Sequence, residues 1–157
     1  MADAISLLKE QHAEVLALLM KVVRSADPVL RANVFRTIDT NVRIHSKIEE
    51  EFFYPAFRER AANGSQAAEV ENNYQDHAAV ARTLAQIERS DPADPFFLQS
   101  IGQLKAQLAE HIHDEEHRFF KEAARLFTPQ ELLTLGYRME NAARAFSPVY
   151  QMSGPRM

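Results

Sequence analysis

The sequence contains no cysteine. Disulfide bonds, thiolate zinc sites and cysteine-ligated iron–sulfur clusters are therefore excluded. Glycine is scarce as well, with 4 residues in a chain of 157, and no glycine-rich loop of the kind that holds phosphate groups is present. Because Ala, Leu, Glu, Gln and Arg are plentiful instead, the composition favours helices.

Long apolar runs and an excess of basic residues are also missing. The longest apolar run near the beginning covers residues 15–20, too short to span a membrane, and no basic segment with an apolar core indicates a signal peptide. The net charge is −4. We therefore expect a cytoplasmic protein with no nucleic-acid partner and no membrane association.

Apolar residues recur at helical spacing, and turn signals divide the chain into four long segments. The predicted helices cover about residues 3–24, 28–62, 66–88 and 95–127. Pro55 lies inside the second helix and should kink it, because proline removes an amide donor. Short connections place consecutive helices antiparallel, so the sequence predicts an all-α fold, an up-and-down antiparallel four-helix bundle.

A capping box at residues 128–131 predicts an additional short C-terminal helix over about 128–146. The remainder, 147–157, contains two prolines and a glycine and is expected to be loose. We therefore expect a single domain over residues 1–157, with the bundle at about 3–127. The added helix offers a surface for oligomerisation or another partner.

One string of residues occurs twice and combines histidine with glutamate. His45 and Glu49 form the first copy and His111 and Glu115 the second; a further glutamate and a pair of phenylalanines follow in both. Residues four apart share one face of a helix. Each copy therefore presents an imidazole and a carboxylate to the same place, which is typical of a metal site.

Four of the six histidines fall one on each predicted long helix, at intervals of 33, 32 and 34 residues. Helix depth can be counted at about 1.5 Å per residue, and the loops can bring all four to one layer. The two halves of the chain then form one pseudo-twofold site at the bundle centre. The candidate metal ligands are His12, His45, Glu49, His77, His111 and Glu115, and we identify no catalytic residue beyond them.

Buried His–Glu pairs without metal are the alternative interpretation, since a single histidine on an apolar helix face is usually a core residue. An ionised carboxylate on a core face is costly unless it is paired or bound to a metal, so Glu49 and Glu115 favour the metal. Phe52 and Phe119, on the same faces, are expected to be core residues around the site.

Several polar residues near the motifs are not candidate ligands. Glu50 and Glu116 point away from the inner face and are expected to be solvated or to cap a neighbouring side chain. His113 and His117 are expected to face water. A ferritin-like site needs Glu-x-x-His on two helices, but this chain has one such string, which begins at Glu110.

The six candidate ligands resemble the pattern of the hemerythrin-like, or HHE cation-binding, family over about residues 3–127. The resemblance implies the four-helix bundle around two non-haem iron ions, although other divalent metals suit the same ligand types. His12 and His45 would hold one iron, and His77 and His111 the other. The two candidate glutamates would bridge both ions, together with a solvent-derived bridge.

Two positions differ from the oxygen-carrying members of this family. The carriers have a fifth histidine one turn before the third-helix histidine, where this chain has Asn73 with Tyr74 beside it. These two residues are the candidates for side chains next to the open place on a metal. The carriers also have an aspartate five residues after the last histidine, where this chain has Glu115 at four and Glu116 at five. The resemblance therefore disfavours reversible oxygen carriage.

Family members without a carrier role are linked to peroxide removal, nitric oxide response, and iron or oxygen sensing. We therefore predict a di-iron protein that acts on O2, hydrogen peroxide or nitric oxide, and leave open whether it turns over, in a catalase-like or another redox reaction. The first alternative is a module that senses or stores iron or oxygen without turnover. The second is a metal-free helical interaction domain.

Overall fold

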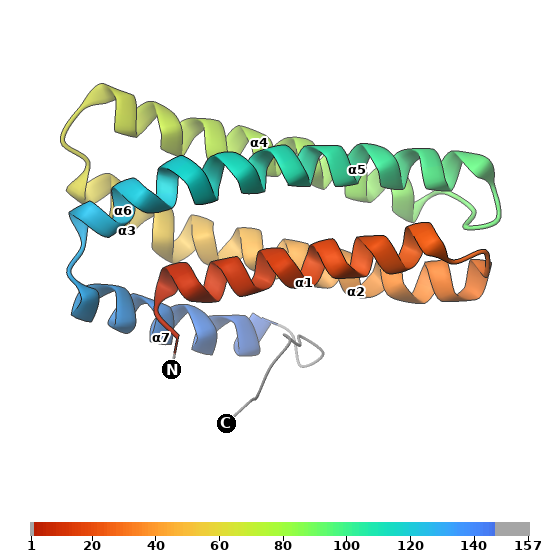
Figure 1. The fold of residues 1–157 in the computed structure, drawn as a ribbon, viewed down its shortest axis with the longest axis horizontal. Coiled ribbons are helices and arrows are strands. Elements are labelled where there is room, and N and C mark those ends of the chain that lie inside the picture. Colours follow the sequence, from red (N-terminus) through yellow and green to blue (C-terminus); the bar gives the residue numbers. More distant parts are fainter. Residues whose placement is uncertain (1, 147–157) are drawn as a thin grey trace.

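A computed structural model describes residues 2–146, which form helices joined by short turns, with no strand among them (Figure 1). The predicted all-α fold is confirmed: four antiparallel helical rods form the bundle. The helices are α1 Ala4–Arg24, α2 Pro28–Ile48, α3 Tyr54–Arg60, α4 Gly64–Glu88, α5 Pro95–Asp114, α6 Phe120–Leu126 and α7 Pro129–Phe146. The second rod is α2 continued by α3, and the fourth is α5 continued by α6 (Figure 1).

A side-chain cap begins each of the four rods. The side chain of Asp27 accepts a hydrogen bond from the amide of Val29 at 3.0 Å, and Asp94 accepts from Phe96 at 2.9 Å. These caps satisfy backbone donors that have no partner within the helix. Asp3 and Asn63 cap α1 and α4 in the same way.

The added C-terminal helix α7 packs along the outer side of α1 and α2 (Figure 1). Its predicted capping box forms, since Glu131 accepts from the Thr128 amide at 2.8 Å and Thr128 Oγ1 accepts from the Glu131 amide at 3.1 Å. Gly136 allows a close approach, because a Cβ there would lie 2.6 Å from the backbone carbon of Asp3. The predicted tail, 147–157, lies outside the described residues, and the single-domain organisation stays a prediction.

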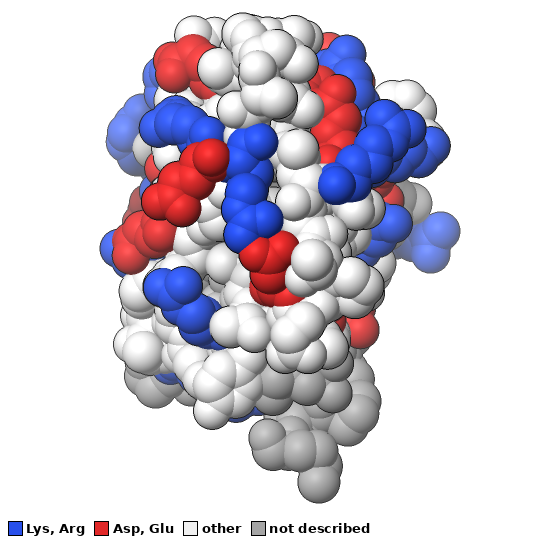
Figure 2. Space-filling view, turned by 90° about the vertical axis from the view of Figure 1, so that its left-hand side faces the viewer, with Lys and Arg blue, Asp and Glu red and all other residues white. Residues whose placement is uncertain are grey.

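Both signs of charge meet at the end of the bundle where the α3–α4 and α6–α7 turns lie (Figure 2). Arg60 of α3 pairs there with Glu131 of α7, which ties the added helix to the bundle. Within the described residues, no helix has the length and apolar character that crossing a bilayer requires. The predicted cytoplasmic location stays a prediction.

Two apolar clusters fill the bundle, one at each end. The cluster near α3, α6 and α7 is rich in aromatic residues such as Phe53 and Phe57, whereas the other is mostly aliphatic. Along α1, Leu8 belongs to the aromatic cluster and Val15 to the aliphatic one, with His12 between them. A buried polar layer therefore separates the two cores.

The second and fourth rods each contain a five-residue π-helical turn, Glu49–Phe53 and Glu115–Phe119. The predicted kink at Pro55 takes this form, but proline is not the general cause, because Lys121 stands at the equivalent place in the fourth rod. The extra residue in each turn shifts the helical face. Phe53 is consequently fully buried, whereas Phe52, predicted to face the core, is only half-buried. π-Helical turns of this kind are frequent at functional sites.

Candidate metal centre

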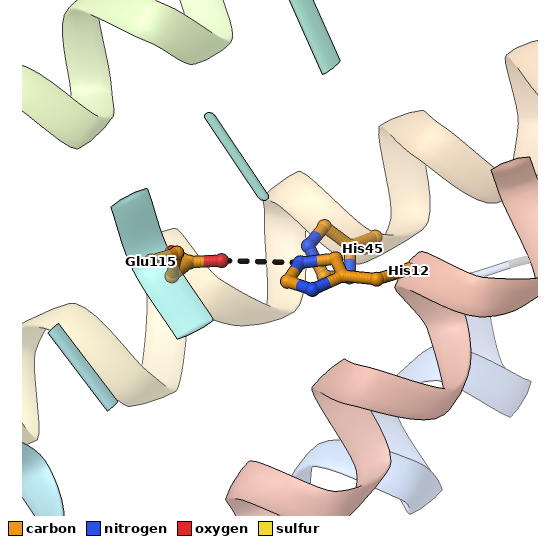
Figure 3. Close-up of side chains that lie close together, drawn as sticks. All are labelled: His12, His45 and Glu115. Atoms are coloured by element: carbon orange, nitrogen blue, oxygen red, sulfur yellow. Dashed lines mark ion pairs between the residues drawn. The ribbon is translucent and has the colours of Figure 1, made fainter. Parts of the chain in front are cut away.

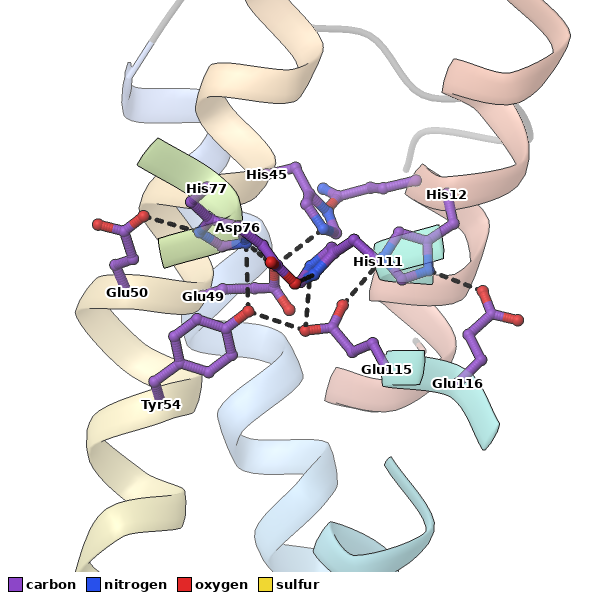
Figure 4. Close-up of polar contacts among 11 residues, drawn as sticks. His12, His45, Glu49, Glu50, Tyr54, Asp76, His77, His111, Glu115 and Glu116 are labelled. Atoms are coloured by element: carbon purple, nitrogen blue, oxygen red, sulfur yellow. Dashed lines mark hydrogen bonds and ion pairs between the residues drawn. The ribbon is translucent and has the colours of Figure 1, made fainter. Parts of the chain in front are cut away.

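Four histidines, one from each rod, surround two glutamates in the polar layer, and all six side chains are buried (Figure 4). Oε1 of Glu49 lies 3.0 Å from Nε2 of His45 and 3.2 Å from Nε2 of His77. Oε1 of Glu115 lies 3.1 Å from Nε2 of His12, and its Oε2 lies 3.7 Å from Nε2 of His111. Each carboxylate therefore reaches one histidine from each half of the chain.

Ligand atoms gather in two sets of three, each set within 4.8 Å. The first set is His12, His45 and Glu115 (Figure 3), and the second is Glu49, His77 and His111. The histidines are grouped in the same pairs that the family resemblance implies. The structure thus brings all six candidate ligands together.

The chemistry of these atoms fits metal ions. Several of them are buried and have no hydrogen-bond partner within the described residues: His12 Nε2, His45 Nε2, His111 Nε2, Glu49 Oε1, Glu49 Oε2 and Glu115 Oε1. Leaving such groups unsatisfied in the interior is costly. Imidazole nitrogen with carboxylate oxygen is a donor set that suits iron, zinc and manganese, and a cation between them would satisfy every one of these atoms.

The outer nitrogen, Nδ1, of every one of these histidines faces a polar partner (Figure 4). The pairs are His12–Glu116 at 2.7 Å, His77–Glu50 at 2.7 Å, His45–Gln11 at 2.6 Å and His111–Asp76 at 2.9 Å. Such partners fix the tautomer and the ring orientation of metal-binding histidines. All four Nε2 atoms are thereby directed at the centre.

The expectation for Glu50 and Glu116 is corrected by these contacts. Neither is simply solvated, because each follows a candidate ligand inside a π-helical turn, which changes the side-chain direction and brings it to the histidine of a neighbouring rod. A repeat in the sequence is the signal that could have identified all four partners. Gln11 and Asp76 come directly before a histidine in their halves, and the two glutamates come directly after Glu49 and Glu115.

Tyr54 is a central residue that sequence reasoning missed. Its hydroxyl group donates a hydrogen bond to Oε2 of Glu115 at 2.8 Å and lies 3.2 Å from Nε2 of His77. The equivalent residue of the other half is Phe120, whose ring stacks on His12 with a centroid separation of 5.9 Å. One half of the site therefore has a hydroxyl group where the other has only an apolar ring.

The two residues expected beside the metal lie further out. Tyr74 is half-buried and donates to the backbone oxygen of Glu50 at 3.3 Å. Asn73 is buried and lines a hollow of about 200 Å³ together with Asp76 and Arg118. The tyrosine that enters the centre is thus Tyr54 rather than Tyr74.

Without a metal, the carboxylates hold protons on two of the histidines. Burial lowers the pKa of His12, but the carboxylates of Glu115 and Glu116 outweigh it and raise the pKa to about 9. Burial acts in the same way on His77, whose pKa is raised to about 10 by Glu49 and Glu50. A metal cation competes with these protons, because it binds neutral imidazole.

The pKa values of other central groups shift in different directions. Burial lowers the pKa of His45, and the charge of Glu49 offsets only part of this effect. Burial lowers the pKa of His111 too, but the charge of Glu115 and the bond to Asp76 leave it raised. The pKa of Tyr54 is raised well above its usual value, first by burial and then by the nearby carboxylates. The tyrosine therefore keeps its proton at neutral pH in the metal-free protein.

A small cavity adjoins the four histidines on the side of the aliphatic core. Its volume is about 20 Å³, and apolar side chains including Val15, Leu108 and Ile112 complete its lining. A groove of about 440 Å³ lies on the surface between α2 and α4. Val42 and Val80 line both spaces. The cavity has room for about one water-sized molecule, so it admits only a small ligand.

His113 and His117 lie on the surface, as expected. Both are exposed, and their rings stack with centroids 4.2 Å apart. His117 Nδ1 donates to the backbone oxygen of His113 at 2.9 Å. These two histidines take no part in the central layer.

Comparison with known proteins agrees with this geometry. A family model described as the hemerythrin HHE cation binding domain matches residues 3–123. The fold is similar to the crystal structure of a hemerythrin HHE cation binding domain-containing protein from Mycobacterium kansasii, with a TM-score of 0.80 and 22% sequence identity over 93% of this chain and 88% of that chain.

A second similarity covers part of a longer protein. A protein of Nostoc sp. that is named DNA nickase is 26% identical over 113 residues, which are 72% of this chain and 31% of that protein. This chain therefore spans about a third of the length of that relative. The nicking of DNA is a property of that whole protein.

Proposed function

The chain belongs to the hemerythrin HHE cation-binding family, and from this premise we propose that it holds two iron ions and acts on a small ligand. The ligand class is dioxygen, hydrogen peroxide or nitric oxide. The observation that carries the proposal is the convergence of buried nitrogen and oxygen atoms that have no hydrogen-bond partner among the described residues.

In this proposal the histidines of each half bind one ion and the glutamates bridge. His12 and His45 would hold one iron, and His77 and His111 the other. Glu49 supports the bridging role, because its carboxylate already contacts one histidine of each pair. Two cations close together repel each other, and shared carboxylates offset that repulsion.

Bound iron would supply redox chemistry and Lewis acidity at this layer. The protein itself supplies orientation, a proton donor and protection from bulk water. Tyr54 keeps a hydroxyl proton beside Glu115, where it can donate to an oxygen-containing ligand. The apolar lining of the cavity excludes large and charged solutes. These features favour reaction with a small neutral molecule over storage of iron alone.

Reversible oxygen carriage is disfavoured by the residues near the site. The fifth histidine of the carriers is replaced by Asn73, and a tyrosine hydroxyl group lies between Glu115 and His77. A donor at this place favours a redox reaction of the ligand over its simple release. We therefore expect peroxide removal, or a related defence against oxidative or nitrosative stress.

The test is to expose reduced, iron-loaded protein to air, and oxidised protein to hydrogen peroxide and nitric oxide, while the visible spectrum is followed. We expect rapid oxidation in air without a long-lived oxygenated form, and peroxide consumption above that of the same amount of free iron. A stable, reversible oxygenated spectrum without peroxide consumption would overturn the proposal. Iron binding with no response to any of the three ligands would favour the sensing or storage alternative.

A further inference from the structure

The two halves of the polar layer differ in one hydrogen-bond acceptor. Gln11 Oε1 faces Nδ1 of His45 at 2.6 Å, and at the equivalent place Asp76 Oδ2 faces Nδ1 of His111 at 2.9 Å. The other two histidines are treated alike, because each faces a glutamate at 2.7 Å. The amide-for-carboxylate difference therefore breaks a symmetry that the rest of these contacts keep.

A carboxylate acceptor changes the histidine that donates to it. The bond is charge-assisted and roughly twice as strong as a bond to a neutral amide. It also makes the opposite ring nitrogen more basic, and loss of such a partner typically costs about 10–100-fold in metal affinity. His111 therefore offers a better Nε2 donor than His45.

We propose that the two metal positions are unequal: the position of His77 and His111 fills first and binds its ion more tightly, and the position of His12 and His45 fills second. This inference rests on the proposed binding of two metal ions. The charge behind each pair supports it, since two carboxylates, Asp76 and Glu50, back the first pair, and one, Glu116, backs the second.

Exposure sets the expected size of the difference. The Asp76 side chain is 48% exposed, and water weakens the effect of its charge, so we expect a loss nearer 10-fold than 100-fold on its removal. Gln11 is 7% exposed. A carboxylate introduced at Gln11 would act through a less polar medium and should change affinity at least as much.

The experiment titrates the metal-free protein with cobalt(II) against a competing chelator, anaerobically, with calorimetry and visible absorption as readouts. In Asp76→Asn we expect the first binding step to weaken about 10-fold. In Gln11→Glu we expect the second step to tighten and the first to stay unchanged. Glu71→Gln removes an exposed charge from the same helix as Asp76 and should change neither step.

A second pair of variants identifies the positions directly and does not depend on whether Gln11→Glu folds. His12→Ala should keep the tight step, whereas His77→Ala should keep only the weak one. The inference is overturned if Asp76→Asn behaves like Glu71→Gln, or if His12→Ala and His77→Ala keep steps of equal affinity. If the unaltered protein binds no cobalt, the proposed function itself fails.

Discussion

The hydroxyl group of Tyr54 donates a hydrogen bond to Oε2 of Glu115 across 2.8 Å. This bond links the second rod to the fourth at the level of the six candidate ligands (Figure 4). It also satisfies one oxygen of a carboxylate that is 1% exposed. Tyr54 therefore stabilises the metal-free centre as well as lining it.

Tyr54→Phe should lower the free energy of unfolding of the metal-free protein by about 1–3 kcal/mol, because a buried carboxylate oxygen loses its donor. Denaturant unfolding measures this loss. Tyr74→Phe is the matched control, since its bond to a backbone oxygen is longer, 3.3 Å, and half-buried. Equal losses in the two variants would show that the bond to Glu115 contributes nothing special.

His45→Ala and His111→Ala should lose metal and, with it, the stabilisation that metal binding gives to the folded state. The melting temperature with and without added iron, together with the metal content, measures both losses. His113→Ala should lose neither, because this histidine is exposed. Loss of as much metal in His113→Ala as in His111→Ala would place the wrong face of α5 inward.

Glu49→Gln and Glu115→Gln should behave as a pair. Each substitution removes one negative charge shared by both ions, so the affinity for the second ion should fall together with that for the first. Elemental analysis of each variant after iron loading measures this. Intact iron content in both variants would count against bridging by these carboxylates.

The pH dependence of stability should differ between the metal-free and metal-loaded protein. The pKa of His12 is raised to about 9 and that of His77 to about 10 in the folded protein, against 6.5 in the ordinary case. A raised pKa contributes stability that is complete below the unfolded value and is lost as pH rises through the folded value. The metal-free protein should therefore lose stability between about pH 6.5 and pH 10.

The loaded protein should not follow this course, because a metal replaces the protons on these imidazoles. Denaturant unfolding at pH 6, 8 and 10, with and without metal, compares the two forms. Parallel curves for both forms would mean that the metal does not compete with the protons of His12 and His77.

The sequence predicted the rods well because their start signals are local. The caps at Asp27 and Asp94 and the apolar spacing depend on neighbours a few residues away, and the structure agrees with them. The six candidate ligands were also found, because the two halves repeat the spacing of histidine and glutamate. That these residues bind metal stays a prediction.

The parts that were missed depend on the π-helical turns. Face assignments from a regular helix hold up to Glu49 and fail beyond it, since the extra residue in the turn rotates everything that follows. This is why Phe53 and Tyr54, rather than Phe52, face the interior. The partners of the Nδ1 atoms, such as Asp76, join residues from different rods, and no spacing within one helix reveals such contacts.

The most direct test of the central claim is the number of iron ions per chain. The protein is purified aerobically with iron supplied, and iron and protein are both quantified. Two buried groups of ligands predict about two irons per chain. One iron or fewer per chain would contradict a di-iron centre built from these six residues.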